Sequence, residues 1–319
     1  MAGIFYNSQY NALVNHINIG SNVRYVNNSM KEAFYYMVNF NSPVTIPNGV
    51  TTVNNAFHSC FNFNQPLVIP DSVTDVSGML QNCTIWNHPV TLPNNVTSLY
   101  QTFGNCQSFN QPLTIPDGVT NMAYTFQRCF KFNQPVIIPD NVTTTGAMFY
   151  LCNSFNQPIT IPDKVTNVYG MFYNCVLFNQ PLTIPPLVTD MREVVQNCFN
   201  FNQPLVIVPN NVTRINNAFR NCTNFNGNIV IYSTSVGNCH ALVNRPSYVK
   251  RINIFIPDNT STTYTKITNT SASASIINKT ITWTNNTSNY CRYNSTYNIY
   301  IYYNLEHYGY ANTEETTGE

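Results

Sequence analysis

A cysteine recurs every 23 residues through most of this chain, and no other feature constrains the fold as strongly. Seven cysteines keep this spacing, and an eighth follows after 24 residues because the unit containing Ile207-Val208-Pro209 holds one extra residue. The column consists of Cys60, Cys83, Cys106, Cys129, Cys152, Cys175, Cys198 and Cys222. Self-similarity at a period of this length predicts a repeat solenoid, in which each unit buries its apolar side against the next.

Two further columns of residues recur at the same spacing as the cysteines. An aromatic residue stands three places after each cysteine, and an asparagine follows it; an earlier unit has the same pair after Met37. The aromatic column is Phe40, Phe63, Trp86, Phe109, Phe132, Phe155, Phe178, Phe201 and Phe225. The asparagine column is Asn41, Asn64, Asn87, Asn110, Asn133, Asn156, Asn179, Asn202 and Asn226. The chain therefore holds about nine units.

The pattern inside one unit predicts its local structure. Leu113 and Ile115 alternate with Thr114, which is typical of a short strand with one buried side, and a proline at 116 ends it. The apolar positions from Val119 onward are spaced by three or four residues, as in a short irregular or helical arc. Stacked units then give a leucine-rich-repeat-like solenoid, a right-handed coil with a parallel β-sheet on one face.

The run Ile115-Pro116-Asp117-Gly118-Val119-Thr120, followed by Phe126, Cys129 and Phe132, resembles the BspA-like leucine-rich repeat. That family has a 23-residue unit with an Ile-Pro-x-x-Val-Thr start, a cysteine and a leucine, and phenylalanine replaces the leucine in this chain. The resemblance covers roughly residues 24–232.

Other residues carry related resemblances. Ala56-Phe57 and Ala218-Phe219 are similar to the Ala-Phe pair of the BspA-like repeat. Met171-Phe172, with Phe178-Asn179-Gln180 after it, resembles the related mycoplasma-type surface repeat. The FNIP repeat shares Phe-Asn-Gln-Pro, with a less similar spacing. These resemblances imply a solenoid with a cell-surface or adhesive role, and they imply no particular ligand.

The regularity of the units divides the chain into three parts. Residues 1–24 are expected to form an N-terminal cap or a docking arm, and residues 25–232 the solenoid. Residues 233–319 are expected to form a β-rich C-terminal domain with an acidic tail, because runs such as 252–256 and 297–302 alternate between polar and apolar or aromatic residues. Clusters of Thr, Ser and Asn between these runs indicate an antiparallel sheet.

Charge and hydropathy exclude several classes of protein. Only 8% of the residues are charged and the net charge is +1, so the chain lacks the basic surface that nucleic-acid binding requires. No stretch of 18 apolar residues indicates a membrane span, and the first ten residues do not resemble a secretory signal. We therefore expect no nucleic-acid partner and no membrane span.

The repeating polar columns favour structural roles. Eight cysteines that face the same way are expected to be an unbonded ladder of buried thiols, although disulfides between neighbouring coils are an alternative. The asparagine side chains are expected to bond to the backbone of turns and of the next coil. The acidic turn residues Asp71, Asp117, Asp140 and Asp163 raise calcium as an alternative, but Asn94 and Asn210 take their place elsewhere, which favours a turn cap.

No catalytic residue, cofactor or metal site is expected from the motifs. The five histidines share no pattern, His88 stands in the Gln position of one unit, and no zinc spacing, phosphate loop or nucleophile elbow occurs.

One column is a candidate contact surface. The outward residues of the predicted strands form a flat, neutral strip in which successive residues lie about 4.8 Å apart. They are Thr45, Val68, Thr91, Thr114, Ile137, Thr160 and Thr183. The strip consists either of ordinary exposed strand residues or of a contact surface for a protein partner or a carbohydrate.

These features favour a non-enzymatic protein that presents a surface. The first hypothesis is a virion component, such as a phage tail, fibre or receptor-binding protein, located on the virion or another extracellular surface. Its partners would be proteins of the assembly and a host receptor or glycan, and the chain could form a homo-oligomer. The alternatives are a bacterial or protist cell-surface adhesin and a purely structural scaffold, with intracellular signalling last.

Overall fold

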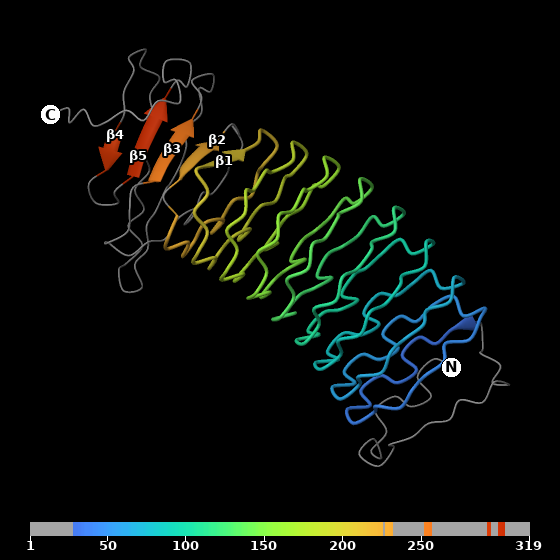
Figure 1. Cartoon of the computed structure of the whole chain (residues 1–319). Helices are drawn as coiled ribbons and strands as arrows, with labels where there is room; N and C mark the ends of the chain where they lie inside the picture. Colours follow the sequence, from blue (N-terminus) through green and yellow to red (C-terminus); the bar gives the residue numbers. More distant parts are fainter. Residues whose placement is uncertain (1–27, 226, 232–251, 257–291, 295–298, 304–319) are drawn as a thin grey trace.

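A computed structural model of the chain describes residues 28–225, 227–231, 252–256, 292–294 and 299–303. The predicted N-terminal cap, Asn226 and most of the predicted C-terminal domain lie outside these residues. The solenoid itself is present: successive coils stack side by side from residue 28 to a small sheet near the C-terminal end (Figure 1). Isolated parallel bridges join equivalent residues of neighbouring coils, as in Asn121 to Thr144 and Thr144 to Asn167.

A tight turn begins each coil after the proline that ends the apolar alternation, such as Pro116. The N–H of Val119 donates to the carbonyl of Pro116 at 3.1 Å, and the same bond, at 3.0 to 3.2 Å, recurs from Pro47 to Val50 through to Pro209 and Val212. The two residues between proline and valine reach the surface, as Asp117 and Gly118 do. The Ile-Pro-x-x-Val pattern is thus the sequence of a hydrogen-bonded β-turn.

The predicted strand of each unit is wrong for most coils. Leu113 and Ile115 are buried and Thr114 is exposed, as the alternation indicates, but the structure has no strand between residues 28 and 204. In those coils only three residues stand between two prolines, and proline has no N–H to donate to a ladder. The segment after Pro204 holds a fourth residue, and it forms the first regular strand, β1 (Leu205–Val208), paired in parallel with β2 (Asn228–Ile231).

The arc after the turn is not helical. Its N–H groups alternate between two acceptors: those of Met122, Tyr124 and Phe126 donate to carbonyls of the next coil at 2.9 to 3.1 Å. The N–H groups of the intervening residues, such as Thr125, donate to the carbonyl three residues earlier in the same coil. Two residues per coil have a positive φ, here Tyr124 at 59° and Arg128 at 60°. The spacing of three or four therefore reflects successive tight turns.

Two rows of aromatic rings fill the core. The predicted row that follows the cysteines is joined by a second row, Phe34, Phe57, Phe103, Phe126, Phe149, Phe172 and Phe219, with Leu80 and Val195 in the remaining coils. Within a coil the two rings stack closely, as for Phe149 and Phe155 with centroids 4.0 Å apart. Between coils the rows continue at a wider spacing, 5.7 Å from Phe149 to Phe172. Each ring thus contacts its own coil and its neighbours, which binds the units into one core.

The sheet at the C-terminal end differs from the predicted antiparallel sheet. It contains β1 and β2 with β3 (Ile252–Ile256), β4 (Arg292–Asn294) and β5 (Ile299–Tyr303), in the order β1-β2-β3-β5-β4. Only β4 and β5 are antiparallel, whereas β3 pairs in parallel with both β2 and β5. Because successive coils wind in the same sense, β2 is parallel to β1, and β3 pairs with the free edge of β2 in the same direction. The domain boundary near residue 232 lies outside the described residues and stays a prediction.

Candidate binding surface

The predicted contact strip lies on the surface in every coil that contributes to it. All seven residues are exposed, and the two apolar members, Val68 and Ile137, are 82% and 85% exposed. Ile207 of β1, 43% exposed, occupies the equivalent place in the next coil. The strip carries no charged side chain, so a partner could cover it without desolvating a charge.

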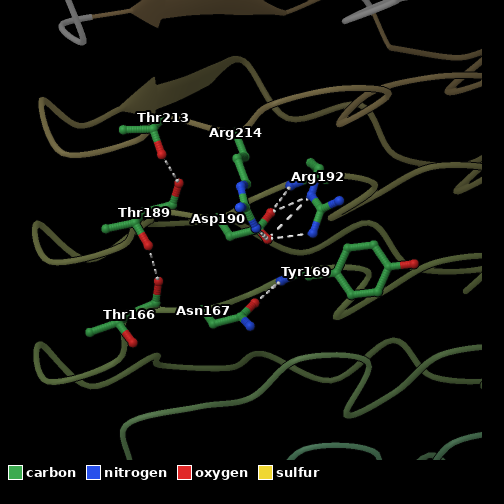
Figure 2. A network of polar contacts seen from close by, with 8 residues as sticks. All are labelled: Thr166, Asn167, Tyr169, Thr189, Asp190, Arg192, Thr213 and Arg214. Atoms are coloured by element: carbon green, nitrogen blue, oxygen red, sulfur yellow. Dashed lines mark hydrogen bonds and ion pairs between the residues drawn. The ribbon is translucent and has the colours of Figure 1, made fainter. Parts of the chain in front are cut away.

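A second row of threonines lies one turn away from the strip. It consists of Thr51, Thr74, Thr97, Thr120, Thr143, Thr166, Thr189 and Thr213, all exposed. The hydroxyl of Thr143 donates to the carbonyl of Thr120 at 3.2 Å, and its backbone N–H donates to the same oxygen at 2.9 Å. Figure 2 shows this ladder through Thr166, Thr189 and Thr213. The recurring Val-Thr pair is visible in the sequence, but its spacing alone does not reveal this bonding.

The acidic turn residues point outward and lie one to a coil. Asp71, Asp117, Asp140 and Asp163 are exposed, as are Asn94 and Asn210 in the same position. In the part of the chain that the structure describes, no group of three or more His, Cys, Asp or Glu side chains could hold a metal ion. A polar group of one such turn bonds to the turn of the neighbouring coil: the Asn141 amide donates to the carbonyl of Asp117 at 3.1 Å.

All eight cysteines of the predicted ladder are buried free thiols. Each thiol donates to a backbone carbonyl 26 or 27 residues earlier, as Cys129 Sγ does to the Phe103 oxygen at 3.1 Å. Burial raises the pKa of Cys60 to about 12 and raises the pKa of Cys129 well above its ordinary value. A thiol that stays protonated is neither a nucleophile nor a metal ligand.

The predicted asparagine ladder links each coil to the next. The side-chain oxygen of Asn110 accepts the N–H of Asn133 at 2.9 Å and the Gln134 amide at 3.3 Å. The same contact to the following asparagine N–H runs from Asn41 to Asn202. His88, in the place of the glutamine, bonds through Nε2 to the carbonyl of Asn64 at 2.9 Å. The structure thus places these residues in coil-to-coil contacts.

The residue after each Val-Thr pair belongs to a further polar column, whose bonding is not evident from the sequence. A Ser, Thr, Asn or Asp stands there in most coils, and its oxygen accepts the N–H two residues later, as Asn167 does from Tyr169 at 2.8 Å. Asp190 bonds Arg192 in the same way and also forms a bidentate ion pair with its guanidinium, with a shortest contact of 2.7 Å (Figure 2). Arg214 approaches the same carboxylate at 3.6 Å.

Aromatic side chains gather beside this ion pair. The guanidinium of Arg192 lies 5.0 Å from the centre of the Tyr169 ring, and the rings of Tyr150 and Tyr173 stack with centroids 4.3 Å apart. Burial is the largest cause that raises the pKa of Tyr150, to about 12, and the neighbouring Tyr173 adds to it. The repeat pattern does not reveal this cluster, because its members stand at different positions of several units.

No helix among the described residues is both long enough and apolar enough to cross a membrane. A comparison with curated proteins finds no significant match.

Two solved structures are similar to this chain. A leucine-rich repeat protein from Bacteroides ovatus is 15% identical, with 65% of this chain and 72% of that chain covered and a TM-score of 0.38. A leucine-rich cell surface protein from Faecalibacterium prausnitzii is 20% identical, with 63% and 75% covered and a TM-score of 0.28.

A family profile matches the chain in four overlapping segments, residues 1–115, 97–204, 162–255 and 185–283. The match includes the whole solenoid, so the resemblance to the mycoplasma-type repeat is confirmed. The chain belongs to the family described as "Mycoplasma protein of unknown function, DUF285".

Proposed function

We propose that this chain is a non-enzymatic attachment protein that binds a partner through its solenoid. The observation that carries the proposal is the contact strip, an uncharged row of exposed side chains with one member in each coil from Thr45 to Thr183. The coils hold this row on a framework with a continuous aromatic core, so little conformational entropy is lost when a partner covers it.

The composition of the strip suits a protein contact. Val68 and Ile137 are more than four-fifths exposed although an apolar side chain gains nothing from contact with water. Their neighbours along the strip are threonines, which combine a methyl group with a hydroxyl and can pack and bond to the same partner. An uncharged surface with isolated apolar anchors is typical of the centre of an interface rather than of its rim.

The chemistry of the described residues gives no comparable support for catalysis. The most abundant potential nucleophiles, the eight thiols of the cysteine ladder, are buried and bonded to carbonyls. Burial also lowers the pKa of His58, which favours its neutral form, and its Nε2 lies 3.1 Å from the Asn82 amide nitrogen.

Two settings for such an attachment protein remain proposals. A virion component is favoured by the low charge and the Asn- and Thr-rich surface, which suit a protein held in an assembly. A cell-surface adhesin is favoured by membership of a family found in mycoplasmas. The two settings predict different co-purification: a virion component accompanies virus particles, and an adhesin accompanies cell envelopes. The third alternative, a purely structural scaffold, predicts no affinity for cells.

The proposal is tested by measuring how the fluorescently labelled full chain binds to host cells. We expect saturable binding that the double variant Val68→Glu/Ile137→Glu lowers at least tenfold, because it places two charges in the contact. Leu177→Glu is the matched control, since Leu177 is also exposed (48%) but lies outside the strip. Binding that both variants retain, or no binding by the unchanged chain, would refute attachment through the strip.

A further inference from the structure

The tyrosine patch is defined by Tyr100, Tyr124, Tyr150, Tyr169 and Tyr173, which lie on the arcs of four neighbouring coils. The rings of Tyr100 and Tyr124 meet edge to face at 5.8 Å, and those of Tyr150 and Tyr173 are parallel within 4° at 4.3 Å. Tyr169 lies on the same arc as Tyr173, and the arcs that carry Tyr124 and Tyr150 are neighbours, joined by the bond from the N–H of Arg128 to the carbonyl of Tyr150. The five rings therefore form one surface feature built from residues far apart in the sequence.

The repeat does not require these tyrosines. The place of Tyr150 and Tyr173 is taken by glutamine in three other coils, at Gln81, Gln127 and Gln196, and the place of Tyr169 by Ser77 or Ala123. Coils without the tyrosines stack through the same backbone bonds. The patch is thus a local departure from the repeat, and its aromatic area is not needed for the coils to stack.

A polar group borders the patch and carries no net charge. Asp190 and Glu193 supply two carboxylates, and Arg192 and Arg214 supply two guanidinium groups. Arg192 is held by both oxygens of Asp190 while its guanidinium lies against the Tyr169 ring (Figure 2). Burial raises the pKa of Tyr169, and the nearby carboxylate of Glu193 adds to this effect. These contacts fix the donors and acceptors at the edge of the patch and cancel their charges.

The backbone of the patch is already bonded. The N–H of Tyr124 donates to the carbonyl of Gly146 at 2.9 Å, and that of Gly170 to the carbonyl of Arg192 at 2.8 Å. An extended peptide could not add to these arcs as a further strand, because that mode of recognition needs unpaired backbone groups. A ligand must therefore be recognised by side chains alone.

From this arrangement we infer that the tyrosine patch binds a neutral oligosaccharide. Each sugar ring offers an apolar C–H face, which can stack on a tyrosine ring, and a rim of hydroxyls, which can bond to Arg192, Glu193 and the tyrosine hydroxyls. Tyrosine suits this task because its ring is rigid and has an apolar face with a polar end. The balanced charge of the polar border favours an uncharged glycan over a sulfated or sialylated one. The contact strip is not involved, so this site is separate from the proposed protein contact.

The inference is tested by saturation-transfer NMR on the full chain with neutral hexasaccharides of glucose, N-acetylglucosamine, galactose and mannose. We expect transfer to the ring C–H protons of at least one hexasaccharide. The double variant Tyr150→Ala/Tyr173→Ala should weaken its affinity at least tenfold. The control Tyr36→Ala removes an exposed tyrosine of the first coil and should leave binding unchanged.

Two further measurements keep a folding defect apart from a binding defect. Tyr150→Phe/Tyr173→Phe retains both rings and should lose less than threefold in affinity, and the melting temperature of every variant is recorded. No transfer to any of the four hexasaccharides overturns the inference, as does equal loss with Tyr36→Ala. Binding of a proline-rich peptide that depends on Tyr150 and Tyr173, with no sugar bound, would assign the patch to peptides instead. None of these results depends on Val68 or Ile137.

Discussion

At the scale of single residues, the coils depend on positions that most side chains avoid. Each coil places two residues in the left-handed region, and glycine occupies such a position only at Gly78 and Gly170 among the described arcs. Asparagine fills the second position in most coils, where its side chain bonds to the coil before, as Asn105 does to Asn82 at 2.9 Å. Asparagine tolerates this conformation better than other residues with a Cβ, so this column lowers the cost of the turn and also links the coils.

Arg128 occupies this asparagine position with a φ of 60° and an exposed side chain. We expect Arg128→Asn to stabilise the chain by about 1 kcal/mol, because it relieves left-handed strain and can bond to Asn105. The measurement is the shift of the midpoint of guanidinium-induced unfolding. Arg128→Ala is the control, since alanine keeps the strain and brings no amide. An equal gain with alanine would mean that loss of the arginine, and not relief of strain, is responsible.

At the scale of the coil, the sequence predicts what is buried better than it predicts the backbone. The alternation around Thr114 and the cysteine spacing correctly place the inner and outer side chains. The expected strands fail because two prolines leave only three backbone donors between them. Of the two alternatives for the arc, the irregular one is correct, because a spacing of three or four also fits consecutive tight turns. The tyrosine patch could not be predicted, because it forms only when several coils bring different columns together.

The thiol in each coil makes stability depend on alkaline pH. Burial raises the pKa of Cys60 from 9.0 to about 12, so above pH 9 the unfolded chain releases a proton that the folded chain retains. Stability is fully present below pH 9 and falls as the pH rises toward 12, by about 1.4 kcal/mol per pH unit for each thiol. We expect urea unfolding from pH 8 to 10.5 to show this decline.

Cys60→Ala separates the thiols from the tyrosines, which also ionise in this range. Its free energy of unfolding should fall less steeply with pH than that of the unchanged chain, and the difference should equal the contribution of one thiol. This difference in slope does not depend on how stable the variant is at pH 7. Parallel curves for the two proteins would show that Cys60 does not contribute.

At the scale of the whole molecule, the stack consists of similar interfaces between successive coils. Most interfaces between coils reuse the same contacts, namely two aromatic rows, the cysteine and asparagine ladders and the alternate backbone bonds of the arcs. Stability should therefore be the sum of coil and interface contributions, and no single coil is needed for the others to stack.

Removing one whole unit tests this additivity. Deletion of residues 122–144 takes out 23 residues and joins Asn121 to Thr145 in register, so we expect a folded solenoid with near-native circular dichroism and lower stability. Deletion of residues 122–143 is the control: it leaves one extra residue in an arc whose N–H groups must alternate between two acceptors. We expect this variant to lose near-ultraviolet dichroism. Equal tolerance of both deletions would contradict a register fixed by the arcs.

The hydrogen bonds between coils run along the stack, and this direction determines how the molecule responds to force. A pull between its two ends would load one coil interface at a time, so the terminal coil peels off before the next is strained. Each event would release one unit of 23 residues, or about 80 Å of extended chain. A stack built in this way would lengthen in small, equal steps at nearly constant tension, rather than fail all at once.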